Sequence, residues 1–322
     1  MADVVVKLEG PGGPEKLTVT EQEPLQPGNG EILVRHEAIG MNFVDIYHRT
    51  GAYALPAYPG VIGVEGAGIV EAVGPAVTAI RTGDRIAYTA TLGAYATRRI
   101  LKAERAFLLP QAVDSRTAAA SMLKAATAYM LLHKTVCVGS GMTVLVHAAA
   151  GGLGAILVRW AKDLGAIVIG TVSTPEKAHI ARSHGADHLV IGRNADLVSE
   201  VRALTDGKGV DVVYDGIGGD TLVQSLRSLK PFGRAVTLGQ AAGPVPPLNV
   251  EELRQGKSLS HASVIAFTAD PANYRQAGEA AIAAIARGLS SIIAADYSLN
   301  DVQEAHRTLE SGRLAGSFLL LP

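Results

Sequence analysis

The sequence contains one cysteine, Cys137, in 322 residues. A single cysteine excludes a disulfide within the chain and any metal site built from several cysteines. Basic residues (29) and acidic residues (30) nearly balance, so the formal net charge is −1. Because no basic run stands out either, the charge pattern gives no support for nucleic acid or an anionic membrane as a main partner.

Long apolar runs are also missing, since no uninterrupted stretch approaches the roughly 18 residues that a membrane-spanning helix needs. The first residues, MADVVVKLEG, have neither the basic region nor the long apolar region of a secretory signal. We therefore expect a cytoplasmic protein with a quiet thiol. The length predicts two domains, and the 48% hydrophobic content is ample for a large core.

The most informative stretch runs from Met142 to Ala166. It reads as a buried strand (Thr143 to His147), a glycine-rich turn and then an amphipathic helix. This order is the context in which a G-x-G-x-x-G-like string predicts dinucleotide binding, although glycine turns also occur for structural reasons alone. One residue departs from the pattern, because alanine takes the place of the first glycine. We expect the turn to contact the cofactor through Ala149, Gly151, Gly152, Leu153 and Gly154.

Strand and helix patterns change near the middle of the chain. The part up to about residue 120 reads as all-β, punctuated by glycine and proline, whereas strands and helices alternate afterwards, as in a parallel doubly wound sheet. Ser260 to Phe267 reads as one more strand, and Asn300 with Gln303 predicts a helix start. The fold class is therefore α/β, with a β-rich domain (1–122 and 268–322) and a Rossmann domain (123–267).

The end of the second Rossmann strand indicates which dinucleotide is bound. No acidic residue stands there to accept a bond from the ribose of NAD; instead the chain has Thr171, Ser173 and Lys177. Hydroxyls and a cation favour the 2′-phosphate of NADPH, and Arg193 could add a second cation. The alternative is that Lys177 is an ordinary exposed helix residue. Strand ends that would face the same cofactor carry Gly216, Leu238, Gly239 and Gln240.

Several strings extend the argument from a motif to a family. They are MNFVDIY (41–47), GVEGAG (63–68), AAS (119–121), Lys124 with Thr127, AAAGGLG (148–154) and GTVSTPEK (170–177). Together they resemble the zinc-independent, zeta-crystallin-like quinone oxidoreductases of the medium-chain dehydrogenase/reductase superfamily. That resemblance implies a GroES-like catalytic domain, NADPH as cofactor, and a homodimer that pairs through the strand Ser260 to Phe267.

The resemblance also implies roles for particular side chains. Asn42, Asp45 and Tyr47 would line the cleft where nicotinamide meets substrate, and Tyr53 would lie near its mouth. Lys124 and Thr127 would contact the nicotinamide side of the cofactor. Without the resemblance, the same residues have a structural interpretation: Asn42 and Asp45 are turn residues, and the side chains of Tyr47 and Tyr53 pack against their neighbours. Relatives often have other residues at Gly192 and Ala125.

Zinc is not expected. Zinc-dependent relatives carry a ligand cysteine in the segment matching Met41 to Asp45, and a ligand histidine before the glutamate that matches Glu65. Here the segment has no cysteine, and Val64 stands in the histidine position. The usual zinc ligands are therefore missing.

The sequence thus predicts an NADPH-dependent quinone reductase that transfers hydride without a metal. A quinone is already electrophilic, so the protein's task would be positioning and exclusion of water. Two alternatives stay open. One is an NADPH-dependent reductase of enone or enal C=C bonds, and the other is a nucleotide-binding structural or RNA-binding protein of the crystallin type.

Overall fold

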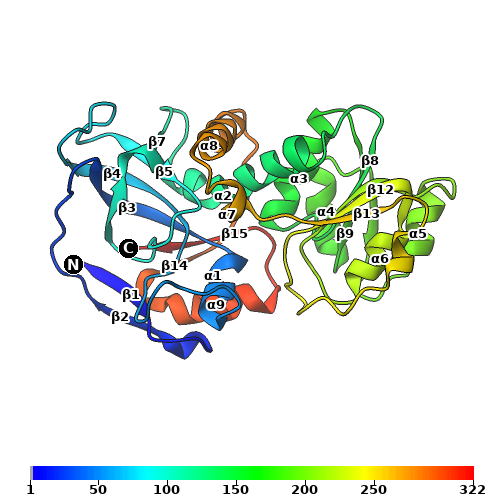
Figure 1. Cartoon of the computed structure of the whole chain (residues 1–322), viewed down its shortest axis with the longest axis horizontal. Helices are drawn as coiled ribbons and strands as arrows, with labels where there is room; N and C mark the ends of the chain where they lie inside the picture. Colours follow the sequence, from blue (N-terminus) through cyan, green and yellow to red (C-terminus); the bar gives the residue numbers. More distant parts are fainter. Residues whose placement is uncertain (1–2) are drawn as a thin grey trace. The chain divides into compact units, whose positions relative to one another are not determined.

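A computed structural model describes residues 3–322 and divides the chain into two compact units (Figure 1). The first unit comprises the chain up to Ala126 together with Thr268–Pro322, and the second is Thr127–Phe267. The boundary near the middle of the chain falls inside one helix, a few residues after the boundary that the sequence suggests.

The first unit is built on a seven-stranded sheet in the order β14-β15-β3-β4-β5-β7, with β6 paired to β3, and a separate β1-β2 hairpin. The last strand, β15, drawn in red in Figure 1, pairs antiparallel with β3 as Leu319↔Gly40 and lies between β14 and β3 in the sheet. The elements are β1 Val4–Leu8, β2 Leu17–Glu21, β3 Glu31–Met41, α1 Phe43–Thr50, β4 Glu65–Val73, β5 Arg85–Tyr88, β6 Arg98–Lys102, β7 Phe107–Leu108, α2 Ser115–Tyr129, α8 Pro271–Ala286, β14 Ile293–Ser298, α9 Val302–Ser311 and β15 Ser317–Leu321.

The second unit is a six-stranded parallel sheet in the order β10-β9-β8-β11-β12-β13. Sequence neighbours run outward from β8 in both directions, which is the doubly wound order expected from the alternating pattern. After a π-helical turn at Met130–Thr135, its elements are β8 Thr143–Val146, α3 Gly152–Asp163, β9 Ile167–Val172, α4 Pro175–Ser183, β10 His188–Ile191, α5 Leu197–Leu204, β11 Val210–Asp215, α6 Thr221–Arg227, β12 Leu229–Thr237, β13 Ser258–His261 and α7 Val264–Phe267.

Burial along β3 explains how the first unit positions its polar site. Alternate residues from Ile32 to Ala38 are buried, as expected for a strand with one face on the core. From Ala38 onward every residue of the strand is buried, and the chain then enters α1. Polar residues just after this strand are therefore held away from solvent, where they need partners.

Three expectations about individual elements were wrong, and one strand was not expected. The first part of the chain is not all-β, because α1 begins directly after Asn42. The expected strand Ser260 to Phe267 ends at His261, since Ser263 accepts a bond from the Ala266 amide and starts the short helix α7. Helix α9 begins at Val302, and its N-cap residue is Asp301 rather than Asn300. The sequence reading also missed β14, whose burial pattern lacks alternation.

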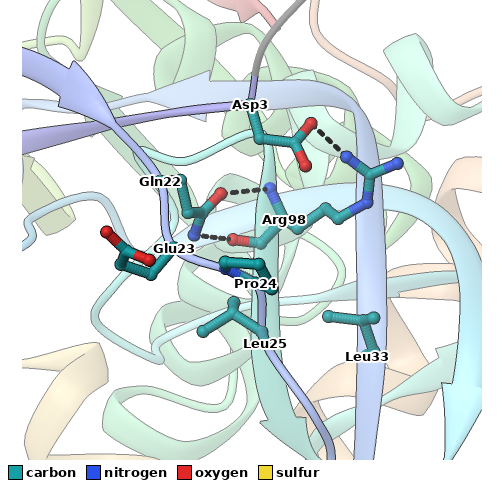
Figure 2. Close-up of a pocket in the computed structure, with 7 residues that line it drawn as sticks. All are labelled: Asp3, Gln22, Glu23, Pro24, Leu25, Leu33 and Arg98. Atoms are coloured by element: carbon teal, nitrogen blue, oxygen red, sulfur yellow. Dashed lines mark hydrogen bonds and ion pairs between the residues drawn. The ribbon is translucent and has the colours of Figure 1, made fainter.

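A pocket in the first unit is lined by residues that flank the β1–β2 hairpin and by Leu33 and Arg98 of the main sheet (Figure 2). The Gln22 amide accepts from the Arg98 backbone N–H (3.1 Å) and donates to its carbonyl (2.7 Å), as a neighbouring strand would. The Arg98 guanidinium pairs with Asp3 and Glu71. Since these polar groups bind one another, the pocket is a structural junction.

Candidate active site and cofactor site

A buried polar cluster forms at the end of β3 in the first unit. The Lys124 ammonium, on α2, donates to Asn42 Oδ1 (2.8 Å) and to Glu65 Oε1 (3.0 Å). Asn42 Nδ2 donates to the same glutamate oxygen at 2.7 Å. Lys124 and Asn42 are each 8% exposed and Glu65 is fully buried, so the ion pair is sequestered from water.

These partners fix the orientation of the Asn42 amide. An ammonium only donates and a carboxylate only accepts, so the amide oxygen must face Lys124 and the amide nitrogen must face Glu65. One N–H of the amide is bound to Glu65, and one remains. Toward a ligand, Asn42 therefore acts as a hydrogen-bond donor.

Two backbone features hold Glu65 in place. Its second oxygen accepts from the Leu123 amide at 2.6 Å. Gly40 makes room for it, because a Cβ there would lie 2.1 Å from the Ala119 carbonyl oxygen and 2.5 Å from Glu65 Oε1. The sequence reading used Glu65 only as an alignment point and missed its role. The available signal was that it is the one charged residue in the apolar string GVIGVEGAGIV.

Asp45 lies one helical turn after Asn42 and is also fully buried. Its Oδ2 accepts from the Asn42 backbone N–H (2.8 Å) and from the Tyr95 hydroxyl (3.1 Å). Burial raises the pKa of Asp45 to about 7, against the lowering effect of those donors and of Lys124. The carboxyl thus titrates near neutrality, close to the Asn42 cluster. The sequence reading missed Tyr95 and His306, which extend this network (3.1 Å between them).

The two tyrosines that the sequence singled out lie together. Tyr47 is on α1, Tyr53 follows it, and their ring centroids are 5.3 Å apart. The Tyr53 backbone N–H donates to the Tyr47 carbonyl at 3.0 Å. Both side chains are only partly buried, so part of each ring remains accessible. Asp45 and Tyr47 are therefore on α1, Asn42 is the N-cap of that helix, and Lys124 on α2 binds Asn42.

This donor set does not fit zinc. Within residues 3–322, His, Cys, Asp and Glu side chains form no group of three or more that could hold a metal ion. Val64 is buried with an apolar side chain, and Lys124 supplies a positive charge between Asn42 and Glu65. A cation beside the same oxygens would meet that ammonium, so the residues disagree with a metal at this position.

The glycine-rich turn of the second unit has the geometry expected of a pyrophosphate cradle. Gly151 is the N-cap of α3 in an extended conformation. A Cβ at Gly154 would lie 2.2 Å from the Ala148 carbonyl oxygen, so only glycine lets the helix approach the turn this closely. Ala149 stands in the place of the first glycine; it is fully buried, and its backbone N–H donates to the Thr171 carbonyl (3.0 Å). The residues present therefore fit a dinucleotide.

Positive charge gathers beyond the end of β9. Thr171 and Ser173 are partly buried there, and Lys177 lies in the first turn of α4. Burial, and then the charge of Arg193, lower the pKa of Lys177. The two cations are thus close enough to repel, which is the arrangement that a dianionic phosphate relieves.

The remaining predicted contacts lie at strand ends of the second unit. Gly216 follows β11, and Leu238 to Gln240 follow β12, at the carboxyl edge of the sheet. Asp215 binds the turn after β11, because its side chain accepts from the backbone N–H groups of Ile217 (2.8 Å) and Gly218 (3.0 Å). Thr127 and Ala125 are buried in α2, and Gly192 has φ 115°.

Among residues 3–322, no helix has both the length and the apolar character needed to span a lipid bilayer.

Comparisons with known proteins agree on one family. Residues 28–113 match the alcohol dehydrogenase GroES-like domain family, and residues 152–284 match the family described as zinc-binding dehydrogenase. The chain is 42% identical over 315 residues to a quinone oxidoreductase of Pseudomonas aeruginosa, covering 97% of both chains. It is 39% identical over 332 residues to a 2-haloacrylate reductase of Burkholderia, covering 100% of this chain and 99% of the relative.

Among solved structures, quinone oxidoreductase of Escherichia coli complexed with NADPH superimposes with a TM-score of 0.93. It is 40% identical in sequence, and the match covers 99% of this chain and 100% of that one.

Proposed function

The chain belongs to the quinone oxidoreductase family of the medium-chain dehydrogenase/reductase superfamily, and we propose that it reduces quinones with NADPH without a metal. The observation that carries the metal-free part is the Asn42–Glu65–Lys124 cluster. Its charges are balanced internally, and one amide N–H is left to point at a ligand.

The cofactor contributes a hydride from its nicotinamide ring when it is bound. The second unit would hold it through the turn Ala149 to Gly154, with Lys177 and Arg193 at the 2′-phosphate. The strand ends at Gly216 and at Leu238 to Gln240 complete the contacts we propose, with Thr127 and Lys124 from α2. Of the two hydroxyls predicted at the 2′-phosphate, we keep that of Ser173, which follows β9.

The first unit supplies polarisation and positioning. Hydride addition to a quinone places negative charge on a carbonyl oxygen, and the Asn42 N–H is a donor fixed before the reaction starts. Lys124 sets the direction of that donor and places a positive charge 2.8 Å from the amide oxygen. The hydroquinone anion then takes a proton from water or from a buried acid; Asp45, with a pKa of about 7, is suited to this.

Steady-state NADPH oxidation with a panel of quinones tests the proposal. Asn42→Ala should lower kcat/KM by about 10- to 100-fold, the range for a hydrogen bond to a charged group. The matched control is Asn300→Ala, an exposed asparagine in the same unit, which should leave turnover unchanged. Wild-type protein that oxidises no NADPH with any quinone would refute the proposal.

A second candidate, reduction of an activated C=C bond, is favoured by the similarity to the 2-haloacrylate reductase. That reaction needs a proton donor placed at carbon, whereas a hydroquinone anion is readily protonated by water. Tyr47→Phe should therefore cost quinone turnover less than about tenfold but enone turnover about 10²- to 10⁴-fold if Tyr47 is the acid. Rapid enone reduction without quinone reduction would select this second function; Tyr53 then serves to position the Tyr47 ring.

We further propose a homodimer that pairs through β13. This strand ends the six-stranded order, so its outer edge has no neighbour among residues 3–322. The Ala262 amide points inward to Thr237 (2.8 Å), so by alternation the His261 amide points outward. His261→Pro should dissociate the dimer in sedimentation at micromolar concentration, while His261→Ala, which keeps the amide, should not. A wild-type monomer would refute the pairing.

A cytoplasmic location is also part of the proposal, supported by the exposed free thiol of Cys137 and by the use of NADPH. The formal net charge of −1 supports a small-molecule substrate over a nucleic acid partner.

A further inference from the structure

A chain of hydrogen bonds runs across the carboxyl edge of the parallel sheet, beneath the end of β9. His147, directly after β8, contacts Thr171 Oγ1 through Nδ1 (3.0 Å) and Ser225 Oγ, on α6, through Nε2 (2.9 Å). Ser225 in turn donates to Asp215 Oδ2 at 2.8 Å. Ser225 and Asp215 are fully buried and His147 is 7% exposed, so the chain is closed to water over most of its length.

The direction of each bond follows from its buried end. The Asp215 carboxylate only accepts, and it accepts hydrogen bonds from the Ser225 hydroxyl and from two backbone N–H groups. The Ser225 oxygen must then accept from His147 Nε2–H. A neutral imidazole with its proton on Nε2 has a lone pair on Nδ1, and that lone pair accepts a hydrogen bond from the Thr171 hydroxyl.

The state of the imidazole agrees with this direction. Burial lowers the pKa of His147, and the nearby negative charge of Asp215 opposes the effect only in part. The ring is therefore neutral in the closed chain. The polar groups that face the ring from the packed elements are the Thr171 and Ser225 hydroxyls, with the Asp215 carboxylate on β11 beyond Ser225.

We propose that the Asp215–Ser225–His147 chain fixes Thr171 as a hydrogen-bond acceptor toward the cofactor ribose, which makes His147 a specificity-determining residue. The Thr171 hydroxyl donates its hydrogen bond to His147 Nδ1, and the Ala148 amide donates to one lone pair of the Thr171 oxygen (3.4 Å). What the hydroxyl offers a ligand is its other lone pair. A ribose 2′-hydroxyl can donate to it, whereas a phosphate dianion cannot.

This inference rests on the proposed use of a nicotinamide dinucleotide and reverses one expectation from the sequence. From the sequence, Thr171 belongs to the groups that favour a 2′-phosphate. The Asp215–Ser225–His147 hydrogen bonds instead make its hydroxyl an acceptor, a weak substitute for the acidic residue that binds the ribose 2′-hydroxyl of NAD. Phosphate recognition then depends on Lys177 and Arg193, whose mutual repulsion a phosphate relieves.

Titration of NADPH and NADH into the apoprotein tests the assignment. Thr171→Val keeps the shape but removes the oxygen, so NADPH affinity should stay within about twofold, while NADH affinity should fall by about 2- to 10-fold, the range of one neutral hydrogen bond. A loss of NADPH affinity with NADH unchanged would overturn the inference, because it would show that Thr171 donates to the phosphate.

Ser225→Ala tests the chain by a second route. Without an acceptor at Nε2, the His147 ring can carry its proton on Nδ1 and donate to Thr171, which frees the threonine hydroxyl to donate. The ratio of NADPH to NADH affinity should then rise several-fold above wild type. An unchanged ratio would contradict the assignment.

A spectroscopic measurement reads the tautomer without any cofactor. In ¹⁵N-histidine-labelled apoprotein, wild-type His147 should show an unprotonated Nδ1 and a protonated Nε2, with its signal assigned by its loss in His147→Gln. The opposite tautomer in wild type would refute the inference. Failure of the proposed function is distinguishable, because wild-type protein would then bind neither dinucleotide, and Lys177→Ala would not change their relative affinities.

Discussion

Replacement of Lys124 by methionine tests the buried cluster most directly. Methionine keeps most of the length of the lysine stem but removes the charge that lies 3.0 Å from Glu65 Oε1. Glu65 is fully buried, so its carboxylate would lose its ion-pair partner in a place that water does not reach. Removing one partner of a buried pair costs about 3–5 kcal/mol of unfolding free energy. We expect the lower end, because the Leu123 amide (2.6 Å) and Asn42 Nδ2 (2.7 Å) still donate to that carboxylate.

Urea unfolding of four proteins measures this cost: wild type, Lys124→Met, Glu65→Gln and the double variant. The double variant should be more stable than the sum of the single losses predicts, because neither charge is then left alone. The matched control is Lys102→Met. Lys102 pairs with Glu31 at the same 3.0 Å, but its side chain is 59% exposed, so the loss should be under about 1 kcal/mol. Equal losses at Lys124 and Lys102 would show that the cluster does not hold a desolvated ion pair.

Three further predictions follow from the charges of the two units. Lys177→Ala should weaken NADPH binding by about 1–3 kcal/mol with little effect on NADH, and equal losses in a titration of both would show that Lys177 does not contact the phosphate. Because burial raises the pKa of Asp45 from 3.8 to about 7, its protonated form stabilises the fold; this stability is full below about pH 4 and is lost as pH rises toward 7. Asp45→Asn should flatten that pH dependence in thermal unfolding, and an unchanged profile would assign it to other groups. Exhaustive chelation should leave quinone turnover intact, whereas one zinc per chain with activity lost on its removal would contradict the metal-free assignment.

The local sequence determined much of the second unit. Alternating buried strands and amphipathic helices predicted the parallel sheet, and the strand expected at Thr143 to His147 is β8, Thr143–Val146. The turn after β8 was also predictable, because glycine at 154 is required by a backbone contact only a few residues away. Lys124 was singled out through the family resemblance, and the structure added its buried partners, Asn42 and Glu65.

Only the tertiary structure decided which groups bind one another. Asn42, Glu65 and Lys124 are far apart in the sequence, and their bonds exist because β3, β4 and α2 converge. The strand expected at Ser260 to Phe267 ended early because one serine capped a helix, a competition that apolar alternation does not register. The Thr171 hydroxyl is a further case in which the sequence does not predict a hydrogen bond. Its residue type permits donation or acceptance, and the choice depends on a carboxylate three hydrogen bonds away on another strand, which accepts because it has no proton to give.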